Sequence, residues 1–404
     1  MTALHRIDVA QAAALVAARM PACGTTTVAL ADAQHCILHE DLHAERDQPP
    51  FNRVTMDGIA IRAAGLAAKP RRFRIAGTQG AGAEAMTLGA DNTCVEIMTG
   101  AMLPDDADTV IPVERIEVKD GFATLEAGYE PEPGQFIHRQ ASDHAIGTVI
   151  LEAGTKLGVP EMAALTVAGK THIKVAQWPR VAVASTGDEL VDIGVDMADF
   201  QIRSSNDWAI AAALQRRGCR RVTRARLPDD LDAMRKAVKS LHDNNDVLVL
   251  SGGVSMGKYD YVPQIMTELG VKLVFHKVLQ RPGLPMWFGV SAAGQPVFAL
   301  PGNPVSSLVC FVRYACPAFM RSLGRRDHAA PRIQLGEAFR FKPDLAFFLP
   351  VVLQHREDGR LVAIPKPTNT SGDFVGLAGT DGFVELPRGQ DDFPAGYAAS
   401  YYAW

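Results

Sequence analysis

Three short runs of apolar residues place the strongest constraint on the fold of this 404-residue chain. Val181–Ala184, Val247–Leu250 and Val297–Leu300 contain no charged residue, as is typical of strands buried on both faces of a parallel sheet. Helical patterns lie between and after these runs, at Asp207–Arg217, Asp229–His242, Pro263–Leu269 and Val305–Phe319. Alternating strands and helices predict an αβα domain built on a mostly parallel sheet.

The segments on either side follow other patterns. The first 45 residues look helical, with Ile7, Ala10 and Val16 near one face and Asp32 placed to cap a second helix. From Phe51 to about Gln140, short β-like runs alternate with Gly, Pro and Asp turns, which predicts a small β-rich domain. Its runs are Phe73–Ala76, Thr93–Met98, Thr109–Pro112, Arg115–Val118 and Phe122–Leu125. A terminal β domain is predicted after Arg326, from Phe347–Leu353, Leu361–Ile364 and Gly382–Leu386.

Composition excludes several classes of protein. A formal net charge of −4 argues against a general nucleic-acid binder. The six cysteines form no CxxC pair and predict reduced thiols in a cytoplasmic protein. The long uncharged run from Gly283 to Val312 contains four prolines, so it predicts buried strands and turns rather than a membrane helix. We therefore expect neither nucleic acid nor a membrane as a partner.

Each buried run leads into a loop of small residues, and ligands bind at this carboxyl edge of a parallel sheet. The glycines of the second loop would let backbone N–H groups approach a phosphate at the start of a helix. A tight turn alone could also explain one such loop, but three on one edge favour a phosphate-bearing ligand. The candidate binding residues are Ser185, Thr186 and Gly187; Ser251, Gly252, Gly253, Ser255 and Gly257; and Pro301, Gly302, Asn303, Pro304 and Ser306.

Acidic residues also stand at these strand ends. Glu189 and Asp260 would repel a phosphate unless a hard cation lay between them, and Mg²⁺ commonly bridges carboxylates and substrate phosphates. Asp229 could join them as a metal ligand, although a helix N-cap is its simpler interpretation. Arg281, followed by Pro282-Gly283, suits an oxyanion.

These loops identify a resemblance to the molybdopterin molybdenumtransferase family, which includes bacterial MoeA and the C-terminal E domain of gephyrin. The matching stretches extend through nearly the whole chain. They are Pro49-Pro50-Phe51, Met56-Asp57-Gly58-Ile59-Ala60, Ile97-Met98-Thr99-Gly100-Ala101, Asp108-Thr109-Val110-Ile111, Ser185 to Leu190, Ser205-Asn206, Ser251 to Asp260, Arg281-Pro282-Gly283 and Pro301-Gly302-Asn303-Pro304.

The resemblance implies an enzyme that binds adenylylated molybdopterin, cleaves the adenylate with Mg²⁺, inserts molybdate at the dithiolene and releases AMP. It also implies a homodimer of four-domain subunits. The domains would be a discontinuous N-terminal helical domain at 1–50 and 141–177, an inserted β-rich domain at 51–140, an α/β molybdopterin-binding domain at 178–326 and a C-terminal small β domain at 327–404. Further expected partners are molybdopterin adenylyltransferase and molybdoenzymes or their chaperones.

Residue by residue, the resemblance assigns catalytic roles to Asp57, Thr99, Asp143, Glu189, Asp229 and Asp260, and adds Ser371 as a candidate match to a serine of the last domain. Two positions depart from the family. The family usually has Lys-Pro-Gly-Lys-Pro where this chain has Arg281-Pro282-Gly283-Leu284-Pro285, so one charge is lost at Leu284 unless Lys258 or Lys277 replaces it. Asn52 stands where an acid is frequent.

Two other functions stay open. The same α/β domain could adenylylate molybdopterin, although the extra β domains argue against this activity. A non-catalytic carrier or scaffold for the cofactor is the other alternative, and the loss of charge at Leu284 favours it. The charge distribution suits an anionic ligand in each case, because residues 178–326 hold 19 Lys and Arg against 13 Asp and Glu, a net of +6.

Overall fold

A computed structural model describes residues 4–254, 261–326 and 330–404, and contacts within the chain divide it into two compact units. The first unit comprises Met1–Glu40, Ala153–Val159 and His172–Trp404. The second comprises Asp41–Glu152 and Pro160–Thr171. The division into four domains stays a prediction.

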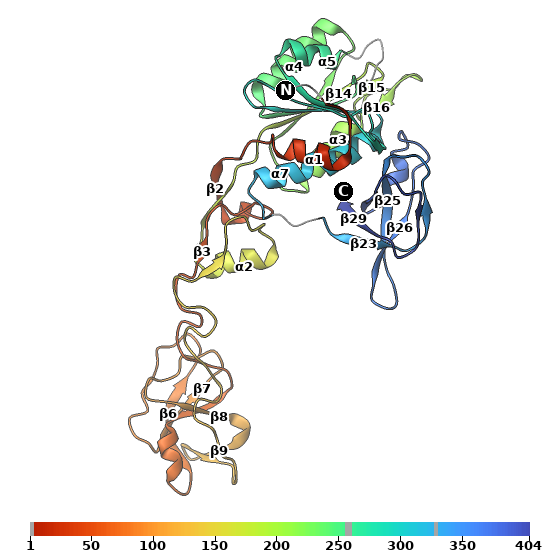
Figure 1. Cartoon of the computed structure of the whole chain (residues 1–404). Helices are drawn as coiled ribbons and strands as arrows, with labels where there is room; N and C mark the ends of the chain where they lie inside the picture. Colours follow the sequence, from red (N-terminus) through yellow and green to blue (C-terminus); the bar gives the residue numbers. More distant parts are fainter. Residues whose placement is uncertain (1–3, 255–260, 327–329) are drawn as a thin grey trace. The chain divides into compact units, whose positions relative to one another are not determined.

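A seven-stranded sheet organises the first unit, in the order β1-β19-β21-β22-β18-β14-β17 (Figure 1). β22, β18, β14 and β17 are parallel neighbours and β21 is antiparallel to both its neighbours, so the predicted mostly parallel sheet is confirmed. The strands are β1 (Leu4–Ile7), β14 (Val181–Thr186), β17 (Val222–Leu227), β18 (Val247–Ser251), β19 (Lys272–Val278), β21 (Trp287–Val290) and β22 (Pro296–Leu300).

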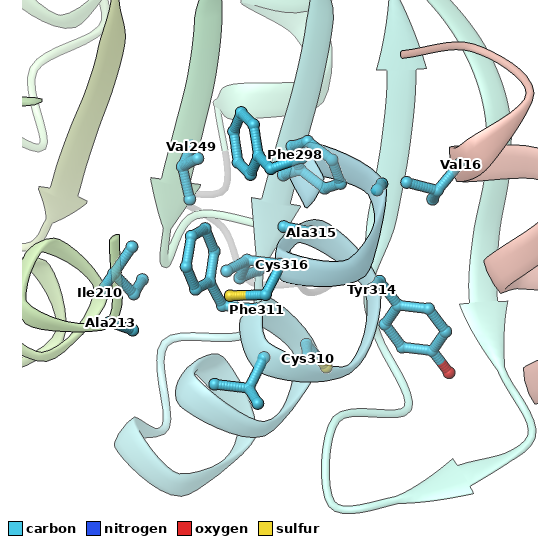
Figure 2. Packing of buried hydrophobic residues seen from close by; sticks show 14 of the residues in the cluster. Val16, Ile210, Ala213, Val249, Phe298, Cys310, Phe311, Tyr314, Ala315 and Cys316 are labelled. Atoms are coloured by element: carbon cyan, nitrogen blue, oxygen red, sulfur yellow. The ribbon is translucent and has the colours of Figure 1, made fainter. Parts of the chain in front are cut away.

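Helices cover both faces of this sheet because successive strand side chains point to opposite faces. Val181 and Val183 pack with α1 (Val9–Ala17), α3 (Asn206–Gln215) and a long helix made of α6 (Pro304–Cys310), the short π-helix η4 (Phe311–Ala315) and α7 (Cys316–Ser322). Figure 2 shows Phe311 of this helix pointing toward the sheet and α3. Ala182 and Ala184 pack with α4 (Leu231–Asn244) and α5 (Val262–Glu268) on the other face.

The beginning of the chain departs from the predicted helical pattern. One helix is present, α1, capped by Asp8, while β1 joins the large sheet beside β19. The second predicted helix is wrong, because β2 (Thr25–Ala29) pairs with β13 (His172–Ala176) and Asp32 ends a single 3₁₀ turn. Three consecutive threonines and a valine in β2 are β-branched, which favours a strand.

The C-terminal segment forms a closed, barrel-like sheet of the first unit. Its order is β20-β25-β26-β23-β29-β27, and β27 returns to pair with β25. Three of its strands match the predicted runs, but the closure was not predicted. The strands are β20 (Gln280–Arg281), β23 (Arg332–Leu335), β25 (Ala346–His355), β26 (Leu361–Pro365), β27 (Gly382–Leu386) and β29 (Ala398–Ala403).

The second unit contains a six-stranded sheet in the order β8-β5-β7-β6-β10-β9. Five of these strands coincide with predicted β-like runs, so the β-rich character of this segment is confirmed. The strands are β5 (Gly58–Ile61), β6 (Arg72–Gln79), β7 (Thr93–Ile97), β8 (Thr109–Pro112), β9 (Ile116–Lys119) and β10 (Phe122–Leu125). Short pairs add β4 (Arg53–Val54) with β11 (Ile137–His138) and β3 (Leu42–His43) with β12 (Val149–Leu151), and α2 spans Val159–Val167. In neither unit does any helix of the described residues have the length and apolar character needed to cross a membrane.

Candidate functional site

A first cavity of about 630 Å³ lies where β14, β18 and β22 end, because these three strands are adjacent and parallel. The three small-residue loops therefore lie side by side, as predicted. Twelve of the predicted site residues line this cavity: Ser185, Thr186, Gly187, Glu189, Asp229, Ser251, Gly252, Gly253, Pro301, Gly302, Asn303 and Pro304. Its volume lies in the range of small-molecule sites.

Buried polar atoms in the lining indicate a polar ligand. Ser185 Oγ and Asn206 Oδ1 are buried and have no hydrogen-bond partner within the described residues. Asn206 Nδ2 donates to Ser251 Oγ and to Gly302 O, both at 2.8 Å, and so ties the second loop to the third. Buried polar groups normally have partners, so these two oxygens fit a ligand that hydrogen-bonds to them. Asn206 was missing from the predicted site, and only the family motif Ser205-Asn206 pointed to it.

The glycine loop is shaped by close approach to the neighbouring loop. Gly252 has φ +95°, and a Cβ there would collide with Thr186 Oγ1, so no other residue fits. Its N–H donates to Leu300 O at 3.1 Å. The predicted use of the Gly252 amide for phosphate is therefore wrong, since the sheet already uses this donor. The Gly253 amide has no acceptor among the described residues. Ser255, Gly257 and Asp260, together with Lys258, lie outside those residues.

Among the described residues, two carboxylates line the first cavity, Glu189 and Asp229. Asp229 is not the N-cap of α4, because Asp230 Oδ1 accepts from Ala233 N in that role. Instead, Asp229 Oδ2 accepts from Asp188 N at 3.2 Å and holds the two loops together. Mg²⁺ uses one or two carboxylates together with substrate phosphates, so this pair fits the ion. No three metal-ligating side chains cluster among the described residues.

A second cavity of about 540 Å³ adjoins the first, and both are lined by Pro285, Pro301 and Asn303. It contains the predicted residues Arg281, Ser306 and Ser371. Ser371 belongs to the C-terminal segment, and its Oγ accepts from Asn303 Nδ2 at 2.8 Å, while its carbonyl accepts from Val305 N.

Two cations of the second cavity were not predicted, Arg340 and Lys342. Arg340 pairs with Asp392 at 3.0 Å, whereas Lys342 forms no ion pair within the described residues. Leu284 lines the same cavity. Of the two lysines suggested as replacements for its lost charge, Lys277 does not line this cavity and Lys258 is not described. Sequence spacing could not find Arg340 or Lys342, because they come from the terminal β domain.

A fully buried network supports the Arg281 turn. Gln280 Nε2 donates to Pro282 O and Gly283 O, both at 3.2 Å, and Tyr314 donates its hydroxyl to Gln280 Oε1. Burial raises the pKa of the Tyr314 hydroxyl well above its usual value, so it remains a donor. The turn that carries Arg281 is thus fixed from inside the core.

Replacing Gly283 by alanine tests this support. Gly283 has φ +94°, and its added Cβ would lie 2.7 Å from Gln280 Nε2 and closer still to Cys310 Sγ. We expect a loss of about 2–4 kcal/mol in the free energy of unfolding, from overpacking together with left-handed strain. Gly294→Ala is the control, because φ is +84° there but nothing lies within 4 Å. Equal losses in urea titrations of both variants would contradict the packing argument.

The other three predicted catalytic residues, Asp57, Thr99 and Asp143, belong to the second unit. Asp57 Oδ1 accepts from both N and Oγ1 of Thr99 at 2.7 Å. Asp143 Oδ1 lies 2.9 Å from His138 Nε2, and Arg53 Nη2 lies 3.1 Å from His138 Nδ1. Because arginine can only donate, Nδ1 accepts and Nε2 carries the proton that His138 donates to Asp143.

The Thr99 contacts predict a change in the titration of Asp57. The backbone N–H and then the hydroxyl of Thr99 lower the pKa of Asp57 below its ordinary value of 3.8. A lowered pKa stabilises the fold above the unfolded-state pKa, and this contribution is lost as the pH falls through the folded-state pKa. Thr99→Val removes the hydroxyl only, so we expect the pKa of Asp57 to rise but stay below 3.8 in an NMR titration. An unchanged pKa would refute the contribution of the hydroxyl.

Three family models match the chain. The MoeA N-terminal region (domain I and II) matches residues 7–169, a probable molybdopterin binding domain matches 182–321 and the MoeA C-terminal region (domain IV) matches 332–404. Both cavities draw residues from the second matched region and from the third, the first cavity through Gly372 and the second through a longer stretch that includes Ser371.

Curated relatives and solved structures agree with these matches. The chain is 40% identical over 399 residues to the molybdopterin molybdenumtransferase of Synechocystis sp., covering 98% of this chain and 100% of that one. It is 30% identical to that of Bacillus subtilis, covering 92% and 88%. The crystal structure of the molybdopterin biosynthesis MoeA protein from Pyrococcus horikoshii matches with TM-score 0.81 and 30% identity, over 98% of this chain and 99% of that chain. The chain therefore belongs to the molybdopterin molybdenumtransferase (MoeA) family.

Proposed function

We propose that this protein inserts molybdenum into adenylylated molybdopterin, with cleavage of the adenylate and release of AMP. The observation that carries the proposal is a pair of adjoining cavities, one lined by carboxylates and orphaned polar oxygens and the other by three cations. The relatives named molybdopterin molybdenumtransferase support the same reaction.

The first cavity would bind the adenylylated pterin. Ser185 Oγ and Asn206 Oδ1 offer hydrogen bonds to the ligand, and the Gly253 amide offers a donor to a phosphate oxygen. Glu189 and Asp229 would hold Mg²⁺ against that phosphate. When bound, Mg²⁺ supplies positive charge that offsets the charge of the phosphate during cleavage.

The second cavity would bind molybdate, which is a tetrahedral oxyanion. Arg281 presents a guanidinium fork suited to an oxyanion, and Ser306 and Ser371 add hydroxyl donors. Because Pro301 and Asn303 line both cavities, the bound molybdate would lie next to the pterin site. The short path between the cavities favours direct transfer of molybdenum to the dithiolene sulfurs.

Reconstitution with purified components tests this function. The protein is mixed with adenylylated molybdopterin, Mg²⁺ and molybdate, and both AMP and active molybdenum cofactor are measured. The proposal requires both products, and omission of Mg²⁺ or molybdate is the control. Production of neither would leave a carrier as the better interpretation, and consumption of ATP with free molybdopterin would indicate the adenylylating activity.

The homodimer, the four-domain subunit and contacts with molybdopterin adenylyltransferase and with molybdoenzymes or their chaperones are further proposals from family resemblance. The homodimer has the simplest test. Light scattering should give twice the 43.5 kDa mass of one chain, and a monomeric mass would refute the homodimer.

The carrier alternative depends on the charge missing at Leu284. Arg281, Arg340 and Lys342 still line the cavity beside it, so we expect Leu284→Lys to change the KM for molybdate by less than about threefold. A gain in turnover of more than about tenfold would instead indicate a weakened or repurposed site. Leu284→Met controls for the change of side-chain shape.

A further inference from the structure

A third cavity, of about 360 Å³, shares no lining residue with the first two. It lies in the first unit, where α7 and β29 contribute lining residues (Figure 1). Four arginines and two tyrosines line it: Arg217, Arg313, Arg325, Arg326, Tyr401 and Tyr402. Among the described residues of its lining there is no aspartate or glutamate.

Two of these arginines are held in fixed positions. Arg217 donates to Ala213 O at 2.8 Å and to Ala403 O at 3.0 Å, so neutral carbonyls orient it and its charge is not cancelled. Arg313 Nε donates to Glu385 Oε2 at 2.6 Å, and its guanidinium lies over the Tyr402 ring. Glu385 thus neutralises Arg313, while the charge of Arg217 remains.

The surroundings add further positive charge. The pKa of half-buried Lys156 is lowered, first by burial and then by the charges of Arg325, Arg217 and Arg216. Arg216 Nη1 donates to Trp404 O at 2.8 Å. Asp327, the acid nearest to Arg325 in the sequence, lies outside the described residues. A concentration of like charges disfavours the folded state unless an anion compensates it.

We propose that the third cavity binds a small dianionic oxyanion, either molybdate or a phosphate group, separately from the two cavities of the proposed reaction. Planar guanidinium groups recognise tetrahedral oxyanions through paired N–H donors, and oriented arginines lose little freedom on binding. The cavity is large enough for a phosphate monoester as well as for the free ion.

Equilibrium dialysis of the full-length Arg281→Ala protein tests the proposal without any enzymatic step. Inorganic phosphate, molybdate and AMP are tested in separate experiments at constant chloride concentration. Comparison of the three shows whether the cavity binds molybdate, free phosphate or a phosphate monoester. Arg281→Ala weakens the second cavity, so we expect molybdate to keep one tight site per chain on this background. Phosphate and AMP also fit the first cavity, and the variants below distinguish their site there from a site in the third cavity. Absence of binding for all three anions would overturn the proposal, whatever the outcome of the reconstitution assay.

Arg325→Ala and Arg321→Ala, each added to that background, locate the site. Arg325 lines the third cavity and has no ion pair among the described residues, so its removal should leave the fold intact and weaken binding at least about tenfold. Arg321 is exposed at the end of α7 but does not line the cavity, and its removal should change affinity less than about twofold. Equal losses in the two variants would indicate diffuse attraction by surface charge and would refute a defined site.

Discussion

Glu189→Gln is expected to lower the rate of adenylate cleavage by about 10²–10³-fold. The side chain lines the first cavity beside Asp229, and it folds back over Gly187, where Oε1 would lie 2.6 Å from an added Cβ. Glutamine keeps the shape but loses the charge that holds a divalent cation. Steady-state release of AMP as a function of Mg²⁺ concentration measures the effect, and the half-saturating Mg²⁺ concentration should rise.

A matched variant separates the metal role from general electrostatics. Asp196→Asn removes one negative charge from the same segment between β14 and α3. Asp196 is exposed and does not line the cavity. We expect normal rates and normal Mg²⁺ dependence for this control. If Glu189→Gln retained more than about a third of the activity at low Mg²⁺, the ion would have to be held elsewhere, and Asp229 with the undescribed Asp260 would be the next candidates.

The sequence predicted the sheet and its site edge well, for a physical reason. Val181–Ala184 and its two counterparts are apolar on both faces, which only a covered parallel sheet permits, so the loops after them had to share one edge. The first turns of the chain were harder, because the alanine-rich start is compatible with helix while β2 is decided by its partner β13. The three threonines and the valine of β2 favour a strand locally, but nothing in the sequence shows that its partner lies about 150 residues away.

Within the site, residue type predicted the lining better than the bonding. Asp229 lines the cavity at the predicted sheet edge, but its neighbour Asp230 caps α4, and a choice between adjacent aspartates depends on backbone direction. Gly252 was predicted to offer its amide, yet the parallel sheet extends one residue further and uses it. Lys342 enters the site through tertiary contacts alone, and Asn206 was indicated only by its place in a family motif. A motif therefore locates a ligand site before it can assign a donor to each atom.

Arg281→Ala is expected to raise the KM for molybdate by about 10–100-fold, because a charged hydrogen bond of this kind contributes about 1.5–3 kcal/mol. Arg281 is exposed in the second cavity, on a turn that Gln280 and Tyr314 hold in place from the core. The backbone that carries its guanidinium is therefore positioned before the anion binds. Arg281→Lys retains the charge without the paired donors and should give an intermediate KM. Initial rates of cofactor formation over a range of molybdate concentrations provide the measurement.

The comparison between substrates makes this prediction specific to the second cavity. Arg281 lines that cavity and not the first, so the KM for adenylylated molybdopterin should change less than about threefold in the same variant. Lys272→Ala removes an exposed cation from β19 and controls for the loss of one positive charge from the first unit. It should leave the KM for molybdate and the KM for adenylylated molybdopterin unchanged. If both constants rose together in Arg281→Ala, the guanidinium would contact the adenylate phosphate. The turn that carries Arg281 would then bind the nucleotide phosphate, and Arg340 and Lys342 would have to bind molybdate.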